Sequence, residues 1–279
     1  MLKWLAPGKA LLDYGPMSMI IEAYERERPL QEAVEAGGAT AVRQLEELTF
    51  NLNAARKPVL ELEAGKDYPP VLASMIEAVR ATGSPDATPM AAVAGSIARE
   101  VLRTLGERGA TRAVVNNGGD IALLLGSGKP LRVGVVTDLA GGAVTHYMDI
   151  KCDRKVGGIA TSGLGGRSFT RGIASAAVAL AKNAPLADAC ATMLANAVNA
   201  DHPEIVRAPA ELLDPSTDIP RQPVTVRVGN LDEETVQSAL AAGRRLFFNY
   251  LAGGLLLGAV LSVQGRVWMH PAGLAARVG

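Results

Sequence analysis

Residues 156–198 constrain the fold more than any other part of the chain. They comprise a loop rich in glycine and hydroxyl side chains, an apolar strand and a helix rich in alanine. Asp188, Thr192 and Asn196 recur every four residues, so they lie on one face of that helix, while its other faces carry Leu, Ala, Met and Val. Because buried polar groups are costly without a partner, we expect this stripe to meet either a metal ion or a nucleotide.

The first two residues of the stripe suit a hard cation. A carboxylate and a hydroxyl one helical turn apart can face one ion, and oxygen ligands together with water and substrate phosphate are what Mg²⁺ prefers. Two simpler interpretations stay open. Thr192 can bond back to the carbonyl of residue 188, and the charge of Asp188 can favour the positive start of the helix.

Residues 161–168, with the sequence TSGLGGRS, combine three glycines with four hydroxyl or guanidinium groups. Glycine turns expose backbone N–H groups to an anion, and Arg167 can bind a phosphate through two parallel hydrogen bonds. The segment lacks the terminal Gly-Lys-Ser/Thr of a Walker loop. An ordinary flexible loop is the alternative.

Residues 116–120, with the sequence NNGGD, stand between two apolar strands. Asn-Gly is the strongest short signal for a hairpin turn, so the segment predicts a hairpin. The glycines can also admit a ligand close to the backbone, with Asp120 in contact with it. The two interpretations are compatible.

A helix is expected over residues 88–106, with Thr88 as its cap, Pro89 in its first turn and Gly106 at its end. Its first turns are unusually small, and Gly95 allows another backbone or a ligand to approach closely. Further helices are expected over residues 39–52, 70–82, 185–199 and 233–251. Strands are expected over residues 16–24, 113–116, 121–125, 131–137, 145–151, 158–161, 175–181, 224–228, 255–263 and 267–269.

The order of these elements is mixed rather than a regular alternation of strand and helix. It indicates an α+β fold in which helices pack on a largely antiparallel sheet, as a single domain over residues 1–279. Residues 201–222 hold four prolines and are expected to be extended. Gln264 and Gly265 suit a tight hairpin turn.

Composition excludes several classes of protein. The 28 basic and 28 acidic residues balance, so the chain has no basic field for nucleic acid or an anionic membrane. Cys152 and Cys190 form neither a disulfide framework nor a zinc pattern, and His146, His202 and His270 follow no ligand spacing. With no signal peptide and no run long enough to span a bilayer, we expect a cytoplasmic protein. The apolar end of the last helix, residues 246–251, belongs either to the core or to a homodimer face.

Five ordered segments together resemble the ApbE-like superfamily, which has the fold of the FAD:protein FMN transferases. They are TPMAAVAG at 88–95, NNGGDI at 116–121, GIATSG at 158–163, GRS at 166–168 and ADACAT at 187–192. The resemblance implies that Asp188 and Thr192 hold Mg²⁺, and that the GGD and TSG segments lie near a flavin. In the transferases a hydroxyl of a target protein displaces AMP from FAD and becomes linked to FMN.

The chain departs from the transferases at three places. Ala94 stands where they have lysine, Arg99 stands where they have aspartate, and a His-containing loop is reduced to GGRSFTRG, with Arg167 near the histidine position. The resemblance nevertheless implies a cytoplasmic protein that binds FAD, FMN or a related phosphate ligand with Mg²⁺.

If the protein is an enzyme, the expected reactions are FMN transfer to a protein acceptor or cleavage of the FAD pyrophosphate. The alternatives are a non-catalytic binding protein and an enzyme acting on another small molecule in the same cleft. The residues expected at the catalytic centre are Asp188 and Arg167. Those expected to bind the ligand are Gly95, Asn117, Gly118, Gly119, Asp120, Thr161, Ser162, Gly163 and Ser168.

Overall fold

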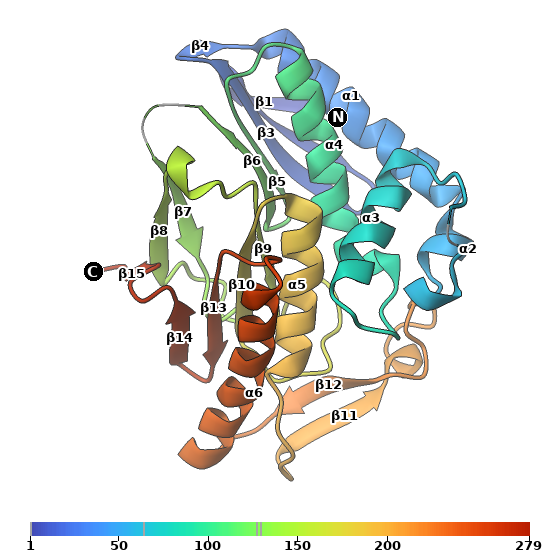
Figure 1. The fold of residues 1–279 in the computed structure, drawn as a ribbon, viewed down its shortest axis with the longest axis vertical. Helices are drawn as coiled ribbons and strands as arrows, with labels where there is room; N and C mark the ends of the chain where they lie inside the picture. The colour runs from blue at the N-terminus through green and yellow to red at the C-terminus, as the bar shows by residue number, and fades with distance from the viewer. Residues whose placement is uncertain (1, 64, 127, 129) are drawn as a thin grey trace. The chain divides into compact units, whose positions relative to one another are not determined.

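The computed structural model describes residues 2–63, 65–126, 128 and 130–279, which group into two compact units (Figure 1). The first unit comprises Met1–Leu131, Lys151–Ala160 and Ala181–Asp188. The second comprises Arg132–Ile150, Thr161–Leu180 and Ala189–Gly279. The chain therefore passes between the units several times, and strand β9 (Gly158–Ser162) and helix α5 (Ala184–Ala197) each begin in the first unit and end in the second.

The first unit is built on an antiparallel sheet in the order β1-β2-β3-β5-β6-β9, in which β4 also pairs with β3. β3 shows why these residues form a strand, because the buried Met17, Met19, Ile21 and Ala23 alternate with less buried residues. The other strands are β1 (Leu2–Ala6), β2 (Lys9–Tyr14), β3 (Met17–Glu25), β4 (Arg28–Pro29), β5 (Arg112–Asn117) and β6 (Asp120–Leu125).

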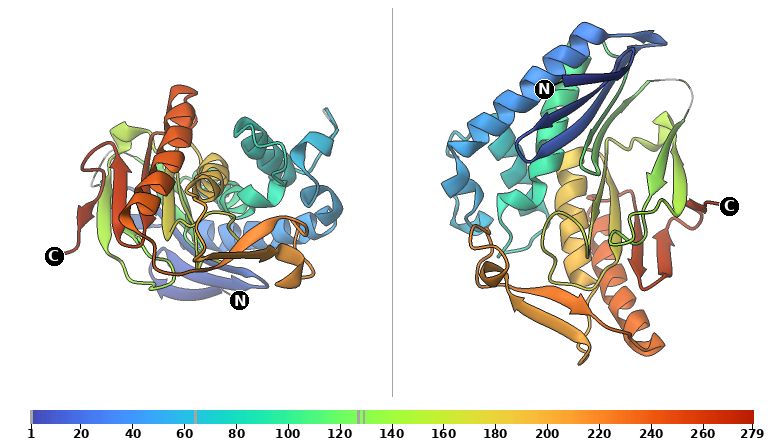
Figure 2. Two further views of the ribbon diagram at one scale, coloured as in Figure 1. Left: turned by 90° about the horizontal axis from the view of Figure 1, so that it is seen from below. Right: turned by 180° about the vertical axis from the view of Figure 1, so that it is seen from behind.

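Helices α1 and α4 pack on this sheet, α1 against β2 and β3 and α4 against β5 and β6 (Figure 2). The apolar stripe of α4, with Ile97, Val101 and Leu105, is fully buried. α1 approaches α4 closely at Gly37, where a Cβ would lie 3.0 Å from Leu105. The helical segments of the first unit are α1 (Gln31–Thr49), α2 (Leu52–Ala55), η1 (Val59–Glu61), α3 (Pro70–Ala81), η2 (Pro89–Ala92), α4 (Val93–Glu107) and η3 (Cys152–Arg154).

The second unit contains β10 (Ala176–Ala181) and β13 (Gly258–Val263), whose residues are all buried, with β14 (Arg266–His270) paired to β13. Helix α6 (Glu233–Ala252) packs on β13. Asp232 caps α6, accepting the N–H of Thr235 at 2.7 Å. β15 (Ala276–Arg277), β8 (His146–Ile150) and β7 (Leu131–Val135) form a further sheet, and β11 (Ile205–Pro209) pairs with β12 (Pro223–Val228), with η4 (Ala210–Leu212) between them.

The α+β class and its largely antiparallel sheets are confirmed, and most element boundaries fall within a few residues of those expected. The hairpin at Gln264 and Gly265 is also confirmed, since both residues have the positive φ angles (43° and 81°) of a primed turn. Within the described residues, no helix is both long enough and apolar enough to cross a membrane.

Three expectations were wrong in detail. α1 begins at Gln31 rather than residue 39, because its first buried face uses small residues such as Ala33 and Gly37 that give little apolar periodicity. α4 begins at Val93 after the short turn η2, so Thr88 does not cap it. The excursion over residues 201–222 is not extended throughout, since it contains the short helix η4 as well as the strand β11. The strand hairpin β1–β2 was not predicted.

Candidate functional site

Two aspartates of the first unit form the most unusual electrostatic feature of the chain. Asp188 lies on the second turn of α5, and Asp120 begins β6. The pKa of Asp188 is raised well above the usual value for aspartate, first because burial disfavours its charge and second because the carboxylate of Asp120 repels it. Backbone hydrogen bonds from Gly95 and Ala94 oppose this rise. Ionising Asp188 beside Asp120 therefore carries an energetic cost.

The carboxylate of Asp188 also completes the start of another helix. Its Oδ2 accepts the backbone N–H of Gly95 at 2.9 Å, in the first turn of α4. The N-cap residue of α4 is Ala92, which has no side-chain acceptor for the unpaired N–H groups of that turn. Asp188 supplies this acceptor from a different helix.

Three glycines hold the start of α5 in this position. A Cβ on Gly95 would lie 2.4 Å from the carbonyl oxygen of Ala184, and one on Gly158 would lie 2.4 Å from the Cα of the same residue. A Cβ on Gly157 would lie 2.1 Å from the carbonyl oxygen of Lys182. The close approach predicted at Gly95 is thus made by the backbone of α5, which explains the glycine without a ligand.

The NNGGD segment forms the predicted hairpin between β5 and β6. Asn117 pairs with Asp120, and the two intervening glycines have φ angles of 66° and 111°. The Oδ1 of Asn116 accepts the N–H of Gly119 at 2.9 Å and closes the turn. The side chain of Asn117 is buried, and its Nδ2 donates to the carbonyl of Ala94 at 3.2 Å. The hairpin therefore contacts the first turn of α4 directly.

The rest of the polar stripe on α5 divides into two cases. Asn196 has a structural role, because its Oδ1 accepts hydrogen bonds from the Thr170 hydroxyl at 3.2 Å and from the backbone N–H of Arg171 at 2.8 Å. Thr192 is partly buried, and its hydroxyl has no hydrogen-bond partner among the residues that the structure describes. The back-bond to the carbonyl of residue 188 is not made.

The glycine-rich loop lies in the second unit and is fixed at its base. Gly163, with φ 145°, packs against the backbone, since a Cβ there would lie 2.8 Å from the carbonyl oxygen of Ala174. Leu164 donates its N–H to the same carbonyl at 2.8 Å. Arg167 and Ser168 are exposed beyond this anchored part. The loop thus presents its cation and hydroxyl on a backbone held at one end.

Of the expected site residues, the structure brings Gly95, Asn117, Asp120 and Asp188 together in the first unit. Thr161, Ser162, Gly163, Arg167, Ser168 and Thr192 belong to the second unit. Sequence reasoning missed the contact between Asp188 and Gly95. The signal for it was the start of α4, where no Ser, Thr, Asp or Asn stands at the N-cap, so that an acceptor must come from elsewhere.

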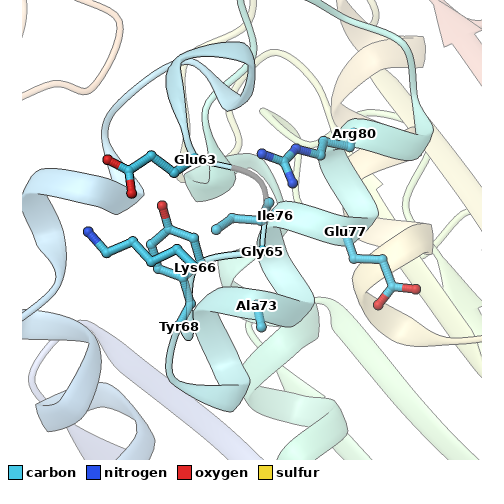
Figure 3. A pocket seen from close by; sticks show the side chains of 8 residues that line it. All are labelled: Glu63, Gly65, Lys66, Tyr68, Ala73, Ile76, Glu77 and Arg80. Atoms are coloured by element: carbon cyan, nitrogen blue, oxygen red, sulfur yellow. The ribbon is translucent and has the colours of Figure 1, made fainter.

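The other titratable side chains of the described residues form no comparable cluster. Across the described residues there is no group of three or more His, Cys, Asp or Glu side chains arranged to hold a metal ion. A hollow of about 290 Å³ lies on the first unit, and none of the expected site residues lines it (Figure 3). Its lining residues are Glu63, Gly65, Lys66, Tyr68, Ala73, Ile76, Glu77 and Arg80.

Comparisons with known proteins cover most of the chain. A family model described as AbpE bacteria matches residues 2–269. A UPF0280 protein of Methanococcoides burtonii is 34% identical over 146 residues, covering 52% of this chain and 60% of that protein. A UPF0280 protein of Methanothrix thermoacetophila is 41% identical over 117 residues, covering 40% of this chain and 47% of that protein. The chain thus spans about half the length of the curated relatives it matches.

The fold also matches a solved structure. The crystal structure of the ApbE protein of Thermotoga maritima aligns with a TM-score of 0.50 and covers 93% of this chain and 96% of that one. The sequence identity is 15%, so this likeness concerns the fold alone.

Proposed function

The chain belongs to the AbpE bacteria family and is a member of the ApbE-like superfamily, and from this premise we propose that it binds FAD, FMN or a related phosphate ligand together with Mg²⁺. Membership suggests a flavin-related role. The observation that carries the proposal is the pair of carboxylates in the first unit, Asp188 and Asp120. Burial first, and repulsion by Asp120 second, raise the pKa of Asp188, and a bound cation would favour its charged form.

The residues present fit Mg²⁺. Asp188 and Thr192 lie four residues apart on α5, so their oxygens project from one face of the helix. The Thr192 hydroxyl has no other partner among the described residues, which leaves it available as a ligand. Mg²⁺ commonly binds one or two carboxylates and takes its remaining ligands from water and substrate phosphates. A site with few acidic side chains therefore suits a cation that arrives with a nucleotide.

The proposed reaction is attack of a hydroxyl on the pyrophosphate of FAD. A hydroxyl of an acceptor protein would lose its proton and form a phosphoester with FMN, while water would give free FMN. AMP leaves in both cases. The bound cation would neutralise charge on the phosphates. Arg167 would bind a phosphate through its guanidinium, and Asp120 would hold the ligand.

A non-catalytic binding protein is the second candidate, and two positions in α4 favour it. Ala94 offers no side-chain cation, and its carbonyl is engaged by Asn117. Arg99 donates from Nη1 to the Ser74 hydroxyl at 3.3 Å, so its side chain is directed to α3. Both positions carry charged side chains in the resembling transferases. An enzyme acting on another small molecule is the third candidate.

Binding is tested by calorimetry of the purified protein with FAD, with Mg²⁺ or with a chelator. We expect FAD to bind when Mg²⁺ is present and to bind more weakly when a chelator removes Mg²⁺. Arg167→Ala should make the free energy of FAD binding less favourable by about 1.5–3 kcal/mol, the scale of a charged hydrogen bond. Arg154→Ala, at an exposed arginine of η3, is the matched control and should bind as wild type does.

Release of AMP from FAD separates the candidates. AMP formation supports the enzyme, and FAD binding without AMP supports the binding protein. A yellow colour after purification would indicate retained flavin. If neither FAD nor FMN binds in the presence of Mg²⁺, the flavin-binding proposal is wrong.

A further inference from the structure

A set of contacts in the first unit leads from the backbone position of Asp120 to the side chain of Asp188 through one asparagine. Asn117 is paired across the hairpin with Asp120. The Nδ2 of Asn117 donates to the carbonyl of Ala94 at 3.2 Å, and the next residue, Gly95, donates its N–H to Asp188 at 2.9 Å. Starting from Asp120, the contacts thus lead through Asn117 and the first turn of α4 to Asp188.

The first turn of α4 has no side-chain cap of its own. It follows the short turn η2, and its N-cap residue, Ala92, makes no side-chain cap. Gly95 has no side chain and is the most flexible residue type in a helix. The Asn117 amide holds this turn from the sheet side, and with 5% of its surface exposed it has little freedom to move.

We infer that Asn117 is a positioning residue, which fixes the first turn of α4 so that the Gly95 N–H holds the Asp188 carboxylate beside Asp120. This inference rests on the proposed cation site for its functional consequence. Asn117 was expected to bind the ligand, whereas its buried amide points to the helix backbone. Its effect on a cation would therefore be indirect, through the placement of Asp188.

The neighbouring asparagine provides a matched control. Asn116 lies in the same strand one residue earlier, and its Oδ1 accepts the N–H of Gly119 at 2.9 Å. It supports the hairpin turn that carries Asp120, but it makes no hydrogen bond to α4 in the described structure. Loss of Asn116 therefore tests whether weakening the hairpin alone changes the environment of Gly95 and Asp188.

The test compares wild type, Asn117→Ala, Asn117→Gln and Asn116→Ala in the metal-free protein. The readouts are hydrogen exchange at the Gly95 amide and the carboxyl ¹³C chemical shift of Asp188, recorded on folded samples. We expect Asn117→Ala to speed exchange at Gly95 about tenfold, the factor that corresponds to one lost hydrogen bond, and to shift the Asp188 signal. Asn117→Gln keeps a donor, so its exchange at Gly95 and its Asp188 signal should lie between those of wild type and Asn117→Ala. It replaces Asn117→Ala as the test if that variant is too unstable to study. Asn116→Ala should leave Gly95 and Asp188 unchanged.

A Mg²⁺ titration with FAD present adds the functional readout. Asn117→Ala should raise the Mg²⁺ concentration needed for half-maximal stabilisation about tenfold, whereas Asn116→Ala should change it little. If wild type shows no response to Mg²⁺ and FAD, the proposed function fails, while the exchange and chemical-shift data still decide the positioning role. Unchanged exchange at Gly95 in Asn117→Ala would overturn the inference, as would equal effects of the two asparagines.

Discussion

Asp188 has two roles that a single substitution can separate. Its carboxylate accepts the Gly95 N–H and so caps α4, and its negative charge is placed beside that of Asp120. The first role needs an oxygen acceptor, and the second needs a charge. Asparagine keeps the acceptor and removes the charge, so Asp188→Asn tests the charge alone.

The pKa of Asp188 in the folded protein is raised above its unfolded value, so ionising this carboxyl costs more in the folded state. Well below the usual aspartate pKa the group is protonated in both states and does not affect stability. As pH rises from the usual aspartate pKa to the raised one, wild type loses stability. Asp188→Asn should therefore be more stable than metal-free wild type at pH 7, because it removes a carboxylate whose charge is disfavoured by burial and by Asp120.

Denaturant melts of both proteins at pH 4 and pH 7 measure this difference. Mg²⁺ with FAD should then stabilise wild type and leave Asp188→Asn unchanged, because a ligand stabilises only the form that binds it. Asp153→Asn, at an exposed aspartate of η3, should respond to Mg²⁺ as wild type does. An equal Mg²⁺ response in wild type and Asp188→Asn would refute the metal site.

Among helices and strands, the packing of α4 against α5 decides the geometry of the site. The contact relies on Gly95, where a Cβ would lie 2.4 Å from the Ala184 carbonyl. Alanine normally stabilises a helix interior by about 1 kcal/mol relative to glycine. Here the added methyl would meet backbone, which cannot move aside as the end of a flexible side chain can.

Gly95→Ala should therefore lower the free energy of unfolding by about 1–3 kcal/mol, the usual cost of overpacking. Gly106→Ala is the control within the same helix. A Cβ there would lie 3.9 Å from Leu124, an ordinary contact, so this variant should gain about 0.5–1 kcal/mol. Urea unfolding measures the change in the free energy of unfolding for both variants. If the two changes have the same sign, the packing argument is contradicted.

The helices and turns that were predicted correctly are those marked by a strong local sequence signal, such as a proline or an Asn-Gly pair. Pro70 begins α3 as expected, and NNGGD forms its hairpin. The start of α1 was missed because Ala33 and Gly37 pack through small surfaces that apolar periodicity does not detect. The bond from Gly95 to Asp188 joins residues 93 positions apart, and no local pattern specifies such a contact.

The site could be predicted only in part for the same reason. The residue types of the GGD segment and of the stripe on α5 were visible in the sequence. Whether each polar side chain faces a ligand or the protein depends on its tertiary partners. Asn196 shows this, because it continues the spacing of Asp188 and Thr192 but bonds to Thr170 and Arg171.

The division into two compact units raises the question of whether the chain unfolds as one domain. β9 and α5 each run from one unit into the other without a break in secondary structure. Because these two elements are continuous, we predict a single cooperative unfolding transition, which would support the single domain expected from the sequence.

The two tryptophans of the chain provide one probe in each unit, since Trp4 lies in β1 and Trp268 in β14. Trp4→Phe leaves a probe of the second unit, and Trp268→Phe leaves a probe of the first. Within each variant, we expect fluorescence and far-ultraviolet circular dichroism to give the same urea midpoint, because one transition removes both signals. Comparing the two signals within one variant controls for the stability change that each substitution causes. A fluorescence midpoint that differs from the circular dichroism midpoint in either variant would show that the units unfold separately.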